Sequence, residues 1–566
     1  MWGILLISVA VGYVAAQSGS EETLVVNIKQ GPVRGHRQTN SDVFAFFGIP
    51  YATAPTGRQK FMPPLAPPQW TDTFDAVNKY IFCIQPQFDS TQEDCLVANV
   101  YVPDTNQTNL PVMVTVHGGS FQFLFGTYQE PVTLVNSTDM IVVTFNYRLG
   151  VHGFLCLGTE EIPGNAGMKD QVALLRWVRD NIAYFGGNPN DVTIEGCSAG
   201  GFSVELLSLS PMAQGLFHRV ISNSGGTIGP LIVQVDPLEN ARIYANALTT
   251  DNVDDIEALE EFYKTASYET LISRVDVIAA RLDSSVLFVP CVEADLGTEM
   301  FLDDAPINLL KKPSLNTYPM LYGYANMEGL LQVESFDVLR HLMNANFSHF
   351  VPADLQFDSD DEKEEVAKKI KQFYFGNEDV NENNILSFID FYTDVLFAYP
   401  MLHTVKIRAE AGHKAIYLYE YSFVDNNTNY VPHTEERGAG HCSQTGAVVD
   451  EDTTNATDEY ILMKEIMREF FTNFVTQGEP VPQGSLLPAW TPANAQRSPH
   501  LSIGPNLQLL GPLSQRRAEF WDGIYEKHYR TPISPRNSAL NIMFSPYFVI
   551  VMLIVNFINN KNSYKY

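Results

Sequence analysis

Short apolar runs rich in valine and isoleucine alternate along this chain with segments whose apolar residues recur at helical spacing. Residues 112–116 and 141–145 are β-branched, mostly apolar runs of the kind that parallel sheets bury on both faces. In residues 170–182 the apolar side chains instead fall on one helical face: Val172, Leu175, Trp177, Val178 and Ile182. The strand series continues at residues 192–194, 220–221, 320–322 and 416–421. This alternation predicts an α/β fold around a mostly parallel sheet with right-handed crossovers.

The first part of the chain has a different pattern. Residues 23–48 alternate apolar and polar side chains and break at Gly31 and Gly35, which predicts antiparallel strands ahead of the parallel sheet. The acidic run at residues 358–365 is expected to begin a solvated helix. Because no repeat or low-complexity linker interrupts the chain, we expect a single domain over residues 17–535.

The first sixteen residues form an apolar run that ends in Val14, Ala15 and Ala16. Small residues at these positions suit cleavage before Gln17, so residues 1–16 are predicted to be a signal peptide. Five Asn-x-Ser/Thr sequons fit a secretory route and are candidate glycosylation sites: Asn106, Asn136, Asn346, Asn426 and Asn455. The sequence therefore predicts an extracellular protein.

A second apolar segment lies near the C-terminus, at residues 542–558. It is shorter than the roughly 20 residues that span a bilayer, although Lys561 and Lys565 follow it as in a cytoplasmic flank. The small residues Ser538 and Ala539 upstream leave a lipid-anchor signal as another interpretation. We expect the tail, residues 536–566, to attach the protein to the outer cell surface. A freely secreted protein is the alternative.

Composition narrows the range of partners. The chain has 566 residues, of which 45% are hydrophobic, so it can bury a large core. Its formal net charge is −29 at pH 7, and an acidic surface repels phosphate backbones. Nucleic acid is therefore not expected as a partner.

A candidate nucleophile stands between a predicted strand and a predicted helix. Residues 196–200, Gly-Cys-Ser-Ala-Gly, match the Gly-x-Ser-x-Gly nucleophile elbow and place Ser198 at its apex. Flanking glycines prevent clashes at such a sharp turn, and the helix N-terminus that follows stabilises an oxyanion. A purely structural glycine-rich turn is the alternative, which the partner residues below disfavour.

Backbone donors for the oxyanion are expected just after another predicted strand. Residues 116–121 read Val-His-Gly-Gly-Ser-Phe, and consecutive glycines let amide groups face a substrate oxygen. We predict that the amides of Gly119 and Ser120 join that of Ala199 in an oxyanion hole.

A serine nucleophile also needs an acid and a base, which follow it in that order on an α/β-hydrolase sheet. Glu328 lies in the loop after the predicted strand at residues 320–322 and is the candidate acid. Asp295 and Glu334 are the alternatives.

The candidate base is His441, which lies about 20 residues past the predicted strand at residues 416–421. The surrounding sequence, Gly-Ala-Gly-His-Cys at residues 438–442, allows a loop tip to place an imidazole beside the elbow. His433 is the alternative base.

The six cysteines divide into one pair and four single residues. Cys83 and Cys95 close a short loop, and in an oxidising compartment they are predicted to form a disulfide. The others are interpreted as buried thiols: Cys156, Cys197, Cys291 and Cys442. Neither HExxH nor paired CxxC spacing occurs, so no metal is expected. A thiolate–imidazole metal site at Cys197, His441 and Cys442 is an alternative if the three converge.

Several ordered motifs together resemble the type-B carboxylesterase and cholinesterase family of α/β-hydrolases. The resemblance spans roughly residues 23–529 and rests on these stretches: Phe-Gly-Ile-Pro-Tyr-Ala (47–52), Glu-Asp-Cys-Leu (93–96), Asn-Tyr-Arg-Leu-Gly (146–150), Phe-Gly-Gly-Asn-Pro (185–189) and Ser-Asn-Ser-Gly (222–225). It implies a large, mostly parallel sheet flanked by helices in a single catalytic domain. The finer likeness is to insect carboxylesterases.

The resemblance also implies roles for individual residues. The triad would be Ser198, Glu328 and His441, with the oxyanion donors already named and the Cys83–Cys95 disulfide. Ser224 would support the catalytic acid, and Glu93 would form an ion pair with Arg148 behind the site.

The chain departs from the family at three places. Ser120 stands where a third glycine is usual, and Cys197 stands where glutamate or glutamine precedes the nucleophile. The loop between Cys83 and Cys95 holds no tryptophan to receive a quaternary ammonium, which disfavours acetylcholine as substrate.

The function that the resemblance implies is hydrolysis of a small-molecule carboxylic ester through an acyl-enzyme, without a cofactor. One alternative is a catalytically silent, neuroligin-like adhesion protein on the same fold. Another is an amidase or lipase with the same machinery, because leaving-group preference depends on the pocket.

Overall fold

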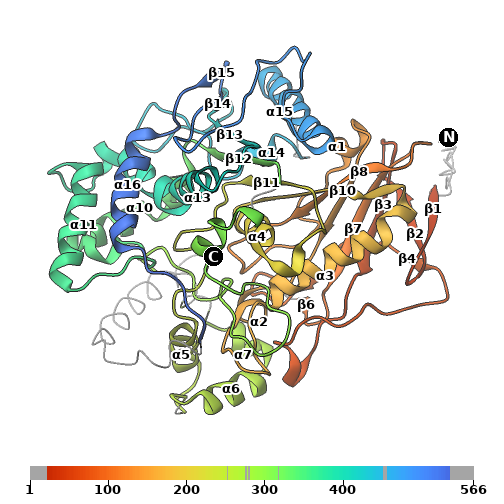
Figure 1. The fold of residues 1–566 in the computed structure, drawn as a ribbon, viewed down its shortest axis with the longest axis horizontal. Helices are drawn as coiled ribbons and strands as arrows, with labels where there is room; N and C mark the ends of the chain where they lie inside the picture. The colour runs from red at the N-terminus through yellow and green to blue at the C-terminus, as the bar shows by residue number, and fades with distance from the viewer. Residues whose placement is uncertain are drawn as a thin grey trace, which may run out of the picture.

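The computed structural model describes residues 22–535, apart from residues 89, 252, 275, 276, 278–280, 316, 317 and 450–454. The predicted signal peptide (1–16) and C-terminal tail (536–566) lie outside the described residues. Figure 1 shows one sheet that runs through the middle of the molecule, with helices on both of its faces.

The described strands form a 13-stranded sheet in the order β1-β2-β3-β7-β9-β8-β10-β11-β12-β13-β14-β15, with β4 paired to β2. Their bounds are β1 (Thr23–Ile28), β2 (Gly31–Arg37), β3 (Val43–Pro50), β4 (Phe74–Asp75), β7 (Val97–Pro103), β8 (Leu110–Val116), β9 (Ile141–Phe145), β10 (Gly187–Cys197), β11 (Arg219–Asn223), β12 (Met320–Ala325), β13 (Ile416–Tyr421), β14 (His500–Ile503) and β15 (Leu507–Leu510). A separate pair joins β5 (Phe82–Cys83) to β6 (Thr91–Gln92).

The sheet is parallel from β9 to β14. The strands before and after this block pair antiparallel, apart from the short β4, which lies parallel to β2. At its centre, Ile194 on β10 lies in register with Val114 on β8 and Val220 on β11. The antiparallel start and the parallel centre match the two sequence patterns. The α/β-hydrolase fold is therefore confirmed. Strand β10 is longer than the predicted residues 192–194.

Helices cover both faces of the sheet. Their bounds are α1 (Val132–Asn136), α2 (Gly150–Phe154), α3 (Ala166–Asn181), α4 (Ala199–Leu209), α5 (Pro237–Leu248), α6 (Ile256–Thr265), α7 (Tyr268–Ile272), α9 (Pro306–Leu310), α10 (Phe336–Ala345), α11 (Asp360–Phe375), α12 (Ile385–Thr393), α13 (Tyr399–Glu410), α14 (Ser443–Gly446), α15 (Asp458–Gln477) and α16 (Gln515–His528). The acidic run begins α11, whose first turn is capped by Ser359, as expected.

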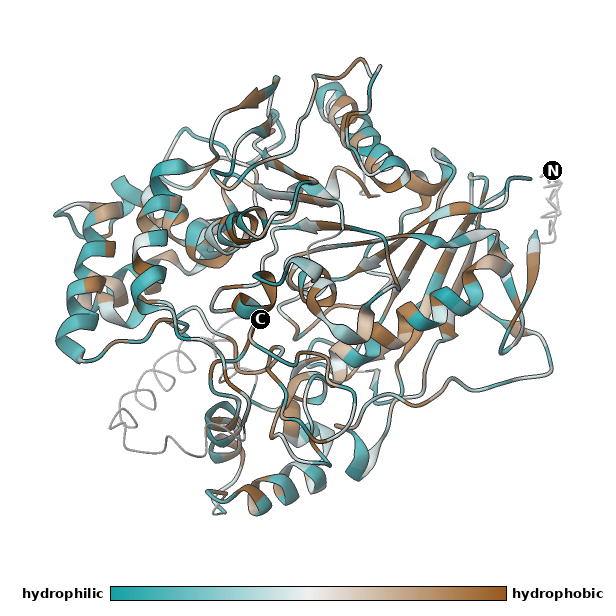
Figure 2. Cartoon of the chain, viewed as in Figure 1, coloured by the Kyte–Doolittle hydropathy of each residue, from teal (hydrophilic) through white to brown (hydrophobic). Residues whose placement is uncertain are grey.

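Side-chain alternation along the strands separates the core into two layers. On β8, Val112 and Val114 belong to the apolar cluster that includes residues of α3 and α4, whereas Met113 belongs to the cluster that includes residues of α15. Figure 2 shows hydrophobic residues along the strands and hydrophilic faces on outer helices such as α11 and α15. The apolar runs of the sequence are thus buried on both faces of the sheet, as parallel strands require.

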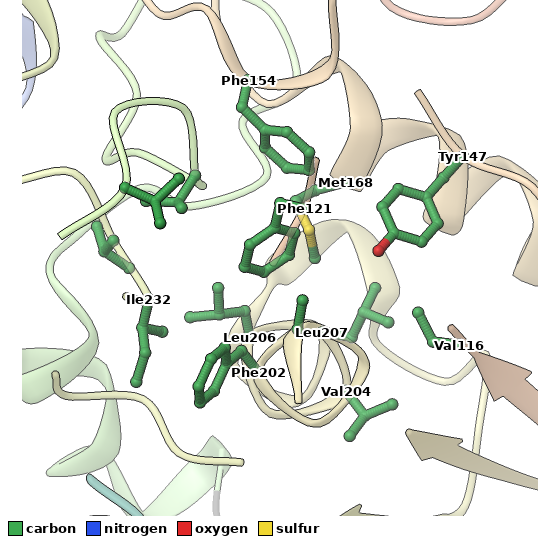
Figure 3. Packing of buried hydrophobic residues seen from close by; sticks show 14 of the residues in the cluster. Val116, Phe121, Tyr147, Phe154, Met168, Phe202, Val204, Leu206, Leu207 and Ile232 are labelled. Atoms are coloured by element: carbon green, nitrogen blue, oxygen red, sulfur yellow. The ribbon is translucent and has the colours of Figure 1, made fainter. Parts of the chain in front are cut away.

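Helix α4 has no exposed side, because every one of its residues is buried. Figure 3 shows Phe202 and Leu206 of this helix packed beside Phe121 and Phe154. The helix that follows the elbow is therefore enclosed on all sides, by apolar contacts and by a buried ion pair between Glu205 and Arg408, which fixes the position of its first turn.

Two sequence-based interpretations are wrong. Cys156 and Cys291 are not thiols but form a disulfide, and so do Cys197 and Cys442, in addition to the expected Cys83–Cys95 bond. The partners are 135 and 245 residues apart, so their proximity arises only from the folded sheet. No described cysteine is free.

The second error concerns the ion pair expected behind the site. Arg148 pairs with Asp170, at 2.8 Å from Nε and 2.6 Å from the terminal nitrogen, and not with Glu93. Glu93 instead accepts a hydrogen bond from the amide of Gly57 at 3.3 Å. Asp170 lies on α3 and is fully buried, so it satisfies the guanidinium more completely than a carboxylate in a surface loop.

Among the described residues, one helical segment, Glu382–Glu410, is long and apolar enough to cross a membrane. Of its most apolar window, 83% is buried inside the protein, which is the environment of a core helix.

Candidate active site

Ser198 occupies the tight turn between β10 and α4. Its backbone has φ 61° and ψ −128°, a region that side chains rarely adopt. A Cβ on Gly200 would lie 2.0 Å from the carbonyl oxygen of Val116, and one on Gly196 would lie 2.4 Å from Gly200. The turn therefore requires glycine at both positions, as the elbow motif predicts.

Glu328 follows β12 and is completely buried. Its Oε1 accepts hydrogen bonds from Ser224 Oγ at 2.5 Å and from the amide of Ala325 at 2.8 Å. Its Oε2 pairs with Nδ1 of His441. One carboxylate oxygen is thus held by the scaffold, and the other holds the imidazole.

The His441 ring is fixed from two directions. Its Nδ1 faces Glu328, and its face stacks on Phe397 with the ring centroids 4.2 Å apart. Because Nδ1 is engaged, Nε2 is the nitrogen left for chemistry.

The structure brings Glu328 and His441 together but leaves their sequence alternatives apart. Asp295 and Glu334 are exposed, as is His433, whose Nδ1 lies 3.7 Å from Glu382.

The predicted oxyanion loop follows β8 directly. Gly119 has φ 94° and Ser120 has φ 53°, so both lie in the left-handed region. A Cβ on Gly119 would lie 2.1 Å from the carbonyl oxygen of Phe123, whereas Ser120 adopts this conformation despite its side chain. Beside them, burial lowers the pKa of His117 to about 4, so this imidazole is neutral near pH 7.

These segments meet at one cavity of about 2450 Å³. Ser198, His441, Gly119 and Ser120 line it, as do Cys197 and Cys442. Much of its wall is apolar and includes Leu231, Val233, Leu238, Leu331, Leu339, Leu396 and Phe397. The cavity can therefore hold a large apolar molecule beside a serine hydroxyl and an imidazole.

The remaining predicted positions are described in part. Four sequons have exposed asparagines, Asn106, Asn136, Asn426 and Asn455, whereas Asn346 is half-buried and caps a short helical turn. Ala199 begins helix α4, where amide groups lack an intrahelical partner. Glycosylation and the oxyanion role remain predictions.

The model of the carboxylesterase family matches residues 22–521. This chain belongs to the carboxylesterase family. It is 31% identical to venom carboxylesterase-6 of Apis mellifera over 540 residues, which cover 91% of this chain and 96% of that protein. It is 31% identical to a juvenile hormone esterase of Tribolium castaneum over 84% of this chain and 86% of that protein.

The similarity to this family extends to a solved structure. Juvenile hormone esterase from Manduca sexta, with OTFP covalently attached, superimposes on this carboxylesterase with a TM-score of 0.78 and 30% identity. The match covers 89% of this chain and all of that one. The protein is therefore an enzyme that hydrolyses carboxylic esters, and a catalytically silent adhesion protein is not supported.

Sequence reasoning missed two features of the carboxylesterase site. Cys197 and Cys442 do converge beside His441, but as a disulfide, which leaves no thiolate pair for the alternative metal site. No group of metal-binding side chains occurs among the described residues.

The second missed feature is a buried polar chain beneath the elbow. Tyr419 donates to Asn223 at 2.6 Å, and Asn223 donates to Glu195 at 3.0 Å. Burial raises the pKa of Glu195 to about 7. The only sequence signal was a glutamate directly after the short run Val-Thr-Ile at residues 192–194.

Proposed function

We propose that this carboxylesterase acts through an acyl-enzyme on Ser198, with His441 as base and Glu328 as the orienting acid. The observation that carries the proposal is the buried pairing of Glu328 with Nδ1 of His441, at a cavity that Ser198 also lines. An imidazole held at Nδ1 presents Nε2 to a serine hydroxyl, which is the arrangement that a serine triad needs.

In the first half-reaction, His441 accepts the hydroxyl proton while Ser198 Oγ attacks the ester carbonyl carbon. The amides of Gly119, Ser120 and Ala199 donate hydrogen bonds to the oxyanion that develops. Collapse of this intermediate breaks the bond to the alcohol, which leaves with the proton from His441.

In the second half-reaction, water replaces the alcohol. His441 takes a proton from the water as its oxygen attacks the acyl carbon. The carboxylic acid then leaves as Ser198 regains its proton. Glu328 holds the imidazole by its Nδ1 and stabilises the imidazolium in both halves.

We infer that the substrate is a small-molecule ester with at least one large apolar group. The apolar wall of the cavity supports this inference. Hydrolysis rates across a series of acyl chain lengths test it, and we expect longer chains to lower KM. Equal KM values for acetyl and octanoyl esters would contradict it.

We also propose a secretory route, with residues 1–16 removed, residues 17–535 as one catalytic domain and residues 536–566 as an attachment segment. Disulfides persist mainly in oxidising compartments, and three are present among the described residues. N-terminal sequencing of the mature protein tests the cleavage. Fractionation with and without phospholipase separates spanning, lipid-anchored and soluble forms.

A fluorophosphonate probe tests the nucleophile. Wild type is expected to be labelled covalently and Ser198→Ala to remain unlabelled. A matched control is Ser203→Ala, which removes a buried hydroxyl from the same helix but not from the cavity. Labelling of Ser198→Ala at the wild-type rate would overturn the assignment.

A further inference from the structure

The proposed nucleophile and base come from segments that are distant in sequence, yet a covalent bond joins them. Cys197 immediately precedes Ser198 and Cys442 immediately follows His441, and the two cysteines form a disulfide with their Cα atoms 6.1 Å apart. Consecutive Cα atoms are about 3.8 Å apart, so each of the two reacting residues is the direct chain neighbour of one end of this disulfide.

Apart from this bond and a ring stack through Phe397, the histidine loop is anchored on the side of the acid. The carbonyl oxygen of Ala439 accepts from the amide of Met327 at 3.0 Å, and its own amide donates to Asn326 Oδ1 at 3.0 Å. His441 itself pairs with Glu328. These contacts fix the base relative to the acid but not relative to the nucleophile.

The elbow has its own, separate anchors. The amide of Ser198 donates to the carbonyl oxygen of Asn223 at 3.0 Å, and helix α4 is buried all around. Phe397 stacks on His441 and also on Phe202 of α4. In the part of the chain that is described, the disulfide is the one covalent bond between residues 196–202 and residues 438–443.

We propose that the Cys197–Cys442 disulfide is a positioning element, which holds the histidine loop against the nucleophile elbow. The inference rests on the proposed triad. Opening the bond leaves the pairing of His441 with Glu328 intact but frees the loop to shift relative to Ser198. Because a displacement of about 1 Å between reacting groups costs on the order of 100-fold in rate, the loss falls on kcat.

The location of the two cysteines at the cavity offers small reductants a route to the bond. Cys197 and Cys442 line the cavity, and Cys442 is half-buried. The Cys156–Cys291 disulfide is inaccessible by comparison, with exposed fractions of 1% and 0%. Dithiothreitol would reduce the cavity bond first, passing two electrons to its sulfurs, which become thiols, while the reagent closes to its cyclic disulfide.

Cysteine substitutions in the full-length chain test the proposal. Cys197→Ser, Cys442→Ser and the double variant are each expected to lower kcat and the fluorophosphonate labelling rate by about 10- to 100-fold, with KM within about twofold of wild type. Because one bond is lost in every case, the double variant should be no slower than the slower single variant. The proposal would be overturned if the rate loss of the double variant equalled the product of the two single-variant losses.

The matched control removes the other long-range disulfide. Cys156→Ser with Cys291→Ser lowers thermal stability but leaves kcat of the folded enzyme unchanged, because neither residue lines the cavity. An equal loss of kcat in this control would show that disulfides act only through overall stability, which would overturn the proposal.

Reduction of the wild type provides a second test that does not depend on folding of a variant. Under mild dithiothreitol, alkylation of Cys197 and Cys442 should increase in step with loss of kcat, and removal of the reductant before alkylation should restore activity. Full activity with both residues alkylated would overturn the inference. Full activity of Ser198→Ala would instead overturn the proposed function.

Discussion

Ser224 donates a hydrogen bond of 2.5 Å to the carboxylate oxygen of Glu328 that His441 does not use. The Ser224 oxygen in turn accepts from Nε2 of Gln444 at 2.8 Å. Because the Gln444 amide donates to the Ser224 oxygen, the hydroxyl proton of Ser224 points toward the carboxylate of Glu328. Two side chains, Gln444 and Ser224, thus orient the acid that orients the base.

Ser224→Ala is expected to lower kcat/KM by about 10- to 150-fold, because a hydrogen bond to a charged group contributes roughly 1.5–3 kcal/mol and each 1.36 kcal/mol is about tenfold in rate. Steady-state kinetics on a short-chain aryl ester measure the loss. The control is Thr227→Val, which removes a buried hydroxyl three residues away that contacts Thr404 and not Glu328. Equal losses in both variants would show that Ser224 acts only through packing.

Gly200→Ala is expected to slow fluorophosphonate labelling by about 100-fold. Its Cβ would lie 2.0 Å from the carbonyl oxygen of Val116, so the elbow must open and move Ser198. The control is Gly523→Ala on α16, where a Cβ meets nothing within 4 Å and helix propensity improves. Labelling rates are compared at the same interval below the melting temperature of each variant. Wild-type labelling of Gly200→Ala would contradict the geometry.

The elbow, the oxyanion loop and the histidine loop could be predicted from the sequence, because each has glycines at fixed positions within a few residues. Gly196, Gly200 and Gly119 all avoid a Cβ contact shorter than 2.5 Å. Such local constraints are readable from spacing alone. The mostly parallel centre of the sheet was predicted in the same way from short runs of buried, β-branched residues.

The long-range pairings were not readable in this way. The Cys197–Cys442 bond joins residues 245 positions apart, so no spacing rule reports it. The family resemblance likewise suggested Glu93 as the partner of Arg148, although Asp170 lies closer through a helix contact. What was missed depends on which side chains the folded sheet brings face to face.

Asp170→Asn is expected to destabilise the fold by about 3–5 kcal/mol, because it leaves the buried Arg148 guanidinium without a counter-charge. Thermal unfolding measures the change. The control is Glu299→Gln, which removes one partner of an exposed pair with Arg176 and should cost less than about 1 kcal/mol. Equal shifts in melting temperature for Asp170→Asn and Glu299→Gln would contradict the expectation that the buried ion pair contributes more stability than the exposed one.

Glu195→Gln is expected to stabilise the protein increasingly as pH rises. Burial raises the pKa of Glu195 from 4.5 to about 7, so between these values the unfolded chain has released a proton that the folded protein keeps. Wild type therefore loses stability from pH 4.5 to 7, by at most about 3 kcal/mol, whereas glutamine does not titrate. The melting-temperature gain of the variant should be largest at pH 8 and smallest at pH 5. Thr193→Val, on the same strand, adds no such pH dependence, and a constant gain for Glu195→Gln would refute the linkage.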